Sequence, residues 1–195
     1  MRDWAKHRIL VAALSVAAFC LAGTARGEER NMTPLSGGVP VIEGVKMLEP
    51  GAAAPDFTVK DVAGQPFRFA EEKAKGATLL VFWSIFCEPC RFEMPVIQKI
   101  HDKYRDGGLQ VVTVALDGEP LKGSITGFIR QEGYTFKVLI DELDDKEMFK
   151  IADPYGVAGT PTLFLVEKGG KVVLSKVGRV KEEDLEKAVQ STLKK

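Results

Sequence analysis

The chain has 195 residues and carries 27 basic and 27 acidic side chains, so its formal net charge is zero. That balance gives no support for a nucleic-acid-binding protein, which needs a basic surface. The length is sufficient for one domain with a hydrophobic core.

The N-terminus has the layout of a signal peptide. Basic side chains within residues 1–8 precede an uncharged run over residues 9–22, and small residues follow, so we expect cleavage near residues 25–27. The run has fourteen residues, fewer than the about 20 of a spanning helix, so a retained membrane anchor is the less favoured alternative. Removal of residues 1–27 leaves 168 residues with a net charge near −3. We expect a periplasmic or other extracytoplasmic protein.

The next elements lead to a central strand. Residues 28–49 contain scattered Pro and Gly without a sustained period, which predicts a flexible leader before a single domain at residues 50–195. Residues 57–59 and 67–69 flank a turn that contains Gly and predict a short hairpin. Residues 71–76 are polar and predict one turn of helix.

The segment at residues 78–95, TLLVFWSIFCEPCRFEMP, contains the main candidate site. Its first six residues place β-branched and aromatic side chains on both faces of a strand, which is typical of a strand covered on both sides. Cys87 and Cys90 follow where the strand ends and a helix begins. Unpaired backbone N–H groups and the helix dipole stabilise an anionic sulfur there. A C-x-x-C in such a β-α-β pattern is typical of a thioredoxin-like redox motif.

Strands and helices alternate through the rest of the chain. We expect a helix that continues to Tyr104 and bends or restarts at Pro95. The further elements expected are a strand at 109–116, a helix at 122–132, a strand at 136–140, a helix at 144–152, strands at 162–166 and 171–177, and a helix at 181–193. This order predicts an α/β domain with a mixed sheet flanked by helices, an N-terminal hairpin and a central helix–strand insertion.

The cysteine count favours redox chemistry. Cys20 lies in the predicted signal peptide, so the exported part holds only Cys87 and Cys90. A disulfide between them closes a ring of four residues and restrains little of the unfolded chain. We therefore interpret the pair as a working dithiol that needs no other cofactor. A zinc site is not expected, because zinc takes four ligands and His101 is the one histidine after the signal peptide.

Five segments of the chain together carry a family resemblance: APDF at 54–57, FW at 82–83, CEPC at 87–90, EMP at 93–95 and YGVAGTPT at 155–162. They resemble the thioredoxin superfamily, and within it the exported TlpA/ResA-like thiol–disulfide oxidoreductases of redoxin or AhpC/TSA type. The resemblance covers about residues 50–193. Phe86 stands where the family commonly has Trp, which affects substrate contacts more than the redox chemistry.

The resemblance assigns roles around the two sulfurs. Cys87 is the expected nucleophile, and Cys90 is expected to resolve the mixed disulfide. Pro89 restricts the turn between them. Glu88 is expected to repel the forming thiolate and raise its pKa, which favours a reductant; a solvated glutamate without influence is the alternative.

Three further positions are expected to serve the site. Pro161 resembles the cis-proline that faces the sulfurs in this superfamily, and with Thr160 it would pair with an extended substrate segment. A trans proline that starts a strand is the alternative. The family places an acidic proton acceptor near the second cysteine, for which Glu119 or Asp117 is the candidate. A turn at Asp117-Gly118 explains the aspartate equally well.

The resulting expectation is an exported protein-disulfide oxidoreductase that reduces other exported proteins. The resemblance implies the haem-attachment cysteines of apocytochrome c as one possible substrate. No nicotinamide or flavin fingerprint is present, so electrons are expected from a membrane partner. A thiol peroxidase is one alternative, because APDF also occurs in peroxiredoxin-like chains. A non-catalytic, redox-switched binding module, such as a copper chaperone, is another.

The remaining polar and aromatic residues of these segments receive no catalytic role. Trp83 and Tyr155 are expected in the core or at its rim. His101 is expected to be solvated, and Arg91 and Glu93 are expected to be ordinary polar positions at a helix start.

Overall fold

The computed structural model describes residues 33–34, 40–41 and 45–194, so the predicted signal peptide lies outside the described residues. Within the leader, β1 (Thr33–Pro34) pairs antiparallel with β2 (Pro40–Val41). The backbone N–H of Leu48 donates to the carbonyl oxygen of Tyr155 at 3.1 Å, so the end of the leader lies against the domain. No helix in the described part of the chain is long and apolar enough to span a bilayer.

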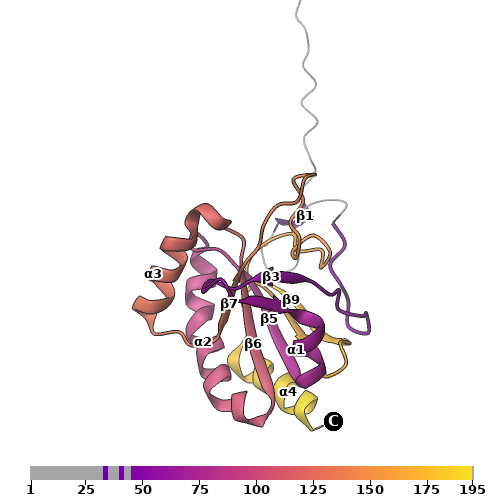
Figure 1. Ribbon diagram of the computed structural model, residues 1–195. Helices are drawn as coiled ribbons and strands as arrows, with labels where there is room; N and C mark the ends of the chain where they lie inside the picture. The colour runs from indigo at the N-terminus through magenta and orange to yellow at the C-terminus, as the bar shows by residue number, and fades with distance from the viewer. Residues whose placement is uncertain (1–32, 35–39, 42–44, 195) are drawn as a thin grey trace, which may run out of the picture.

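The domain is a five-stranded mixed sheet covered on both faces (Figure 1). Its strand order is β7-β6-β5-β8-β9, and a separate hairpin, β3–β4, packs beside it. The elements are β3 (Thr58–Lys60), β4 (Pro66–Arg68), α1 (Phe69–Lys75), β5 (Ala77–Trp83), α2 (Glu88–Tyr104), β6 (Leu109–Ala115), α3 (Lys122–Glu132), β7 (Lys137–Ile140), β8 (Thr162–Val166), β9 (Val172–Val177) and α4 (Glu182–Leu193). The predicted α/β class, hairpin and mixed sheet are confirmed.

The central strand β5 organises both halves of the core. All seven of its residues are buried. Because side chains alternate along a strand, Leu79, Val81 and Trp83 pack with α2, α3 and α4, whereas Leu80 and Phe82 pack with β4, α1 and residues 151–155. The unbroken run of buried residues in β5 therefore reflects two separate cores, one on each face of the sheet.

The sheet register brings three chain segments to one edge. Strand β5 is parallel to β6, with Trp83 opposite Ala115, and antiparallel to β8, with Phe82 opposite Thr162. The end of β5, the end of β6 and the start of β8 are therefore neighbours. The cysteine motif, the turn after Ala115 and the segment before Thr162 meet at this edge.

The predicted helix at residues 144–152 is wrong, because this segment forms turns and bridges. Leu143 and Phe149 form an isolated antiparallel bridge. The Asp144 carboxylate accepts two backbone N–H groups at 2.8 and 3.1 Å, and Asp141 accepts those of Ile151 and Ala152. Aspartate side chains that bind nearby N–H groups compete with helix formation, so the central insertion consists of α3 and β7 followed by this loop.

Candidate active site

The two cysteines lie at the N-terminus of α2 and are joined by a disulfide. Cys87 is the N-cap residue, and its Sγ accepts a hydrogen bond from the Cys90 N–H at 3.2 Å. Pro89 occupies the first turn, where a missing N–H costs no helical hydrogen bond. The helix then runs through Pro95 to Tyr104 without interruption.

Exposure distinguishes the two sulfur-bearing residues. Cys87 is partly exposed, whereas Cys90 is only 1 % exposed. A partner molecule can therefore reach Cys87, and Cys90 is placed to react with Cys87. The free N–H groups and dipole of the helix start favour an anionic sulfur at the cap position.

Asp117 holds the segment that leads into the cysteines. Its Oδ1 accepts a hydrogen bond from the Ser84 hydroxyl at 2.6 Å, and its Oδ2 accepts one from the Ile85 N–H at 3.1 Å. The Ser84 hydroxyl oxygen also accepts the Phe86 N–H at 3.1 Å. Asp117 therefore fixes the path from β5 to Cys87, a role that the turn interpretation did not include.

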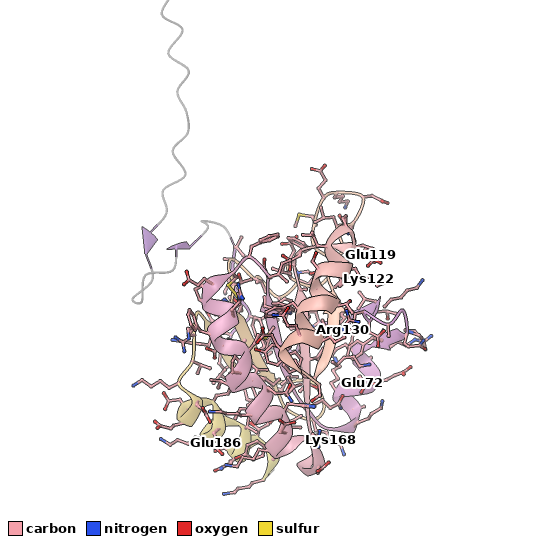
Figure 2. The ribbon with its side chains drawn as sticks, turned by 90° about the vertical axis from the view of Figure 1, so that its left-hand side faces the viewer. Glu72, Glu119, Lys122, Arg130, Lys168 and Glu186 are labelled. Atoms are coloured by element: carbon pink, nitrogen blue, oxygen red, sulfur yellow. A yellow bond between two sulfur atoms is a disulfide. The ribbon has the colours of Figure 1, made fainter. Side chains whose placement is uncertain are left out.

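The structure places Glu119 at the surface. Its side chain is 57 % exposed and pairs with Lys122 at 2.9 Å, at the start of α3 (Figure 2). Glu88 is exposed too, and it makes no ion pair with any described residue.

Glu93 is the buried carboxylate on the helix of the cysteines. It lies three residues after Cys90, on the same helix face, and is 1 % exposed. Its Oε1 accepts the Val180 N–H at 3.2 Å, and its Oε2 lies 3.4 Å from the Arg179 Nε. Burial raises the pKa of Glu93, and the Val180 hydrogen bond and the Arg179 charge oppose that rise only in part.

The interpretation of Glu93 as an ordinary polar position was wrong. The signal that could have identified it is the helical period, because Cys90, Glu93, Ile97 and Ile100 recur at spacings of three or four residues. All four side chains are buried. A carboxylate on such a stripe is a candidate functional group.

The segment before β8 contains the predicted cis peptide bond, between Thr160 and Pro161. Pro161 is buried, and its carbonyl oxygen accepts the Gly178 N–H at 2.8 Å. Thr160 is partly exposed at the same sheet edge as the disulfide. The pairing of this segment with a substrate stays a prediction.

Two aromatic residues of the matching segments lie in the core, and His101 is partly buried. Trp83 and Tyr155 are fully buried, as predicted, and the Tyr155 hydroxyl donates to the Pro55 carbonyl oxygen at 2.9 Å. His101 is partly buried against Phe136, and burial lowers its pKa, so the expectation of a solvated residue was wrong.

Phe86 and Phe92, on either side of the cysteine motif, are 76 % and 59 % exposed. Among the described residues, no group of three or more His, Cys, Asp or Glu side chains could hold a metal ion.

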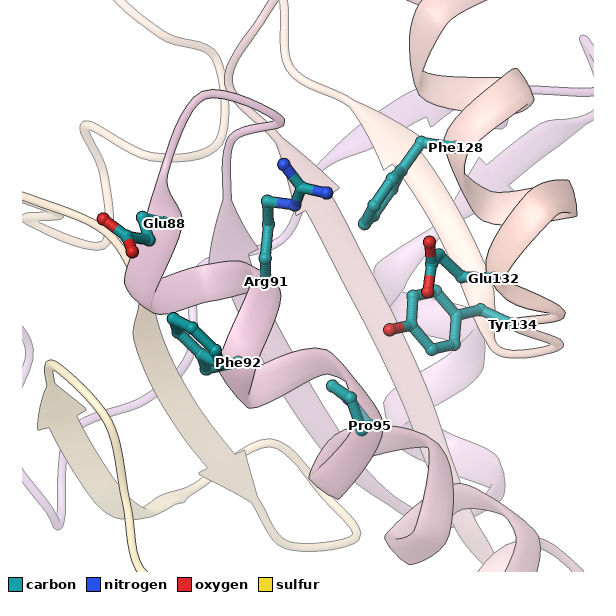
Figure 3. A pocket seen from close by; sticks show the side chains of 7 residues that line it. All are labelled: Glu88, Arg91, Phe92, Pro95, Phe128, Glu132 and Tyr134. Carbon is teal, nitrogen blue, oxygen red and sulfur yellow. The ribbon is translucent and has the colours of Figure 1, made fainter.

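A cavity of about 320 Å³ lies between α2 and α3 (Figure 3). Its lining residues are Glu88, Arg91, Phe92, Pro95, Phe128, Glu132 and Tyr134. The Arg91 guanidinium reaches from α2 toward α3 and lies 5.6 Å from the centre of the Phe128 ring. The cavity thus begins at the residue that follows Cys87.

Comparisons with known proteins agree with this geometry. Residues 50–175 match the AhpC/TSA family. The thiol-disulfide oxidoreductase ResA of Bacillus thuringiensis is 36 % identical over 139 residues, which cover 71 % of this chain and 76 % of the relative. ResA of Geobacillus thermodenitrificans is 34 % identical over 141 residues, covering 72 % and 76 %.

Solved structures show the same likeness. A Chlorobium tepidum protein assigned as the thiol:disulfide interchange protein DsbE is 34 % identical, with a TM-score of 0.65 over 75 % of this chain and 99 % of its own. StoA from Bacillus subtilis is 26 % identical, with a TM-score of 0.57 over 72 % and 99 %. The chain therefore belongs to the AhpC/TSA family and, within the thioredoxin superfamily, to the ResA/TlpA-like thiol–disulfide oxidoreductases.

Proposed function

We propose that this oxidoreductase works outside the cytoplasm as a reductant of disulfides in exported proteins. The observation that supports it is the asymmetry of the two cysteines: Cys87 caps a helix and is partly exposed, and Cys90 is buried one turn further on. That asymmetry suits a nucleophile and a resolving thiol. The Cys87–Cys90 pair is the only redox group that the proposal requires.

The proposed reaction transfers two electrons to the client. The Cys87 thiolate attacks one sulfur of the client disulfide, which breaks that bond and releases the other client sulfur as a thiolate. The Cys90 thiolate then attacks the Cys87 sulfur and forms the Cys87–Cys90 bond. This step releases the second client sulfur, so the client leaves as a dithiol and the protein is oxidised.

The reducing direction rests on Glu88. A carboxylate beside Cys87 disfavours the thiolate, which makes the reduced form a better electron donor. Exported proteins form disulfides readily, so such a reductant needs electrons from elsewhere. We propose a membrane protein as the donor and, following the resemblance, apocytochrome c cysteines among the clients.

Three measurements test this proposal. The reduction potential of the Cys87–Cys90 pair is expected near about −270 mV or lower, whereas about −120 mV would indicate an oxidant. Reduced protein is expected to reduce insulin, and Cys87→Ser is expected to abolish that activity. Cys90→Ser is expected to retain client proteins as mixed disulfides on Cys87. Full insulin reduction by Cys87→Ser would contradict the assigned nucleophile.

Export is tested separately by cell fractionation of the full-length chain. We expect the protein outside the cytoplasm, with a new N-terminus near residues 25–27 when the signal is cleaved. A cytoplasmic, full-length product would contradict this part of the proposal and leave the redox chemistry unaffected.

A further inference from the structure

The cavity between α2 and α3 adjoins the reactive sulfur. Glu88, Arg91 and Pro95 line it from α2, and their spacing of three and four residues puts them on one face of that helix. Glu88 directly follows Cys87. A polypeptide whose cysteine reacts with Cys87 therefore has neighbouring residues within reach of the cavity.

The wall on the α3 side is aromatic and held in place. The centre of the Phe128 ring lies 5.7 Å from the ring centre of the buried Trp83 and 6.0 Å from that of Tyr134. The Tyr134 ring stacks on the Phe136 ring, with 5.2 Å between their centres. Gly133 adopts a left-handed conformation, with φ of 72°, that turns the chain so that Tyr134 returns to α3. Because these rings are already packed, binding an apolar group here orders little else.

The polar groups of the cavity favour a basic partner. Glu88 and Glu132 are both exposed, and the carboxylate of neither forms a hydrogen bond or ion pair with another described residue. The one cation of the lining, Arg91, is engaged over the Phe128 ring at 5.6 Å. The unpaired Glu132 carboxylate beside the apolar wall is complementary to an apolar side chain that has a cationic neighbour. The Glu88 carboxylate points away from α3, on the far side of Arg91 (Figure 3).

We propose that this cavity is a subsite for the client polypeptide: it takes a bulky apolar side chain near the client cysteine, with a Lys or Arg beside it that faces Glu132. The inference rests on the thiol–disulfide exchange at Cys87 and adds a sequence preference to it. During the mixed disulfide, Cys87 holds the client covalently and the cavity holds the adjacent residues.

The test uses the reduced protein and three synthetic peptides, each closed by one internal disulfide. The pair of residues next to one cysteine is Phe-Lys, Ala-Lys or Phe-Glu. Single-turnover rates are measured against peptide concentration by acid quench and mass spectrometry. We expect half-saturation for Phe-Lys at about 10-fold lower concentration than for Ala-Lys. We expect half-saturation for Phe-Lys at about 3-fold lower concentration than for Phe-Glu, and we expect this difference to shrink at high salt.

Variants assign each preference to a residue. Phe128→Ala is expected to remove the preference for Phe over Ala, and Glu132→Lys to remove or invert the preference for Lys over Glu. Glu183→Lys, at an exposed position in the first turn of α4, is the matched control and is expected to keep both. Each preference is a ratio within one variant, so a general loss of activity does not affect it.

The results that would overturn the proposal are distinct. Equal half-saturation for the three peptides in the unmodified protein excludes the subsite. Survival of the Lys-over-Glu preference in Glu132→Lys excludes the subsite as well. This second test does not depend on Phe128→Ala, a variant that also removes packing against Trp83. If none of the peptides is reduced, the exchange activity itself fails, and the subsite fails with it.

Discussion

Arg179 and Glu93 form an ion pair between the surface and the core of the protein. The Arg179 side chain is 56 % exposed and that of Glu93 is 1 % exposed, with the Arg179 Nε 3.4 Å from the Glu93 Oε2. The same guanidinium lies 5.7 Å from the centre of the exposed Phe92 ring. A contact on Phe92 can therefore affect the charge environment of a carboxylate one turn from Cys90.

Glu93→Gln is expected to change the pH dependence of stability. Burial raises the pKa of Glu93 above its ordinary value of 4.5. The folded protein therefore binds a proton on the Glu93 carboxyl group more tightly than the unfolded chain does. Stability therefore falls as pH rises from the unfolded value through the raised folded value. Glutamine keeps the acceptor for Val180 and has no charge to bury, so the variant should lack this fall.

Urea denaturation at a series of pH values measures this effect as a difference between the variant and the unmodified protein. Asp141 has a raised pKa too, but it contributes equally to both proteins and cancels in the difference. Glu183→Gln, at an exposed position, is the matched control. A difference that stays constant from pH 4 to neutral pH would contradict the buried titration.

Arg179→Gln tests whether the arginine acts through Glu93. Loss of the guanidinium leaves the buried carboxylate without its partner charge, and we expect a cost of about 1 kcal/mol at neutral pH, because Arg179 is itself half exposed. The cost should disappear in the Glu93→Gln background. An equal cost in both backgrounds would show that Arg179 stabilises the fold by other contacts, such as the one with Phe92.

The sequence predicts those parts of the site that local patterns determine. The Cys87–Cys90 motif follows a run of residues that is typical of a doubly covered strand, and residues 155–162 match a family pattern that includes the cis-proline. The burial of Glu93 depends on Val180, 87 residues away, and so requires the tertiary structure. The loop at residues 144–152 has helix-compatible spacing, but Asp141 and Asp144 bind its N–H groups and prevent the helix.

Asp117 should be required for a rigid approach to Cys87. Asp117→Ala removes the acceptor of the Ser84 hydroxyl and the Ile85 N–H, and such losses cost about 1–3 kcal/mol. Asp117→Asn retains one acceptor oxygen and should cost less. Chemical denaturation gives the free energies, and the rate of insulin reduction should fall in the same order. A slower rate without any loss of stability would instead indicate a direct role of the carboxylate at the sulfurs.

Gly156→Ala is expected to displace the end of the leader from the domain. Gly156 has a φ of +66°, and a Cβ there would collide with the backbone of Lys46 and Met47. Gly133→Ala is the matched control, because Gly133 has a φ of +72° with open space around its Cβ position. Backbone strain alone should cost about 1–2 kcal/mol at either site, so any greater cost at Gly156 measures the contact with the leader. Hydrogen exchange should then be faster at Leu48, whose N–H donates to Tyr155. Equal costs for the two substitutions, with protection at Leu48 unchanged, would show that the leader contributes no stability through this contact.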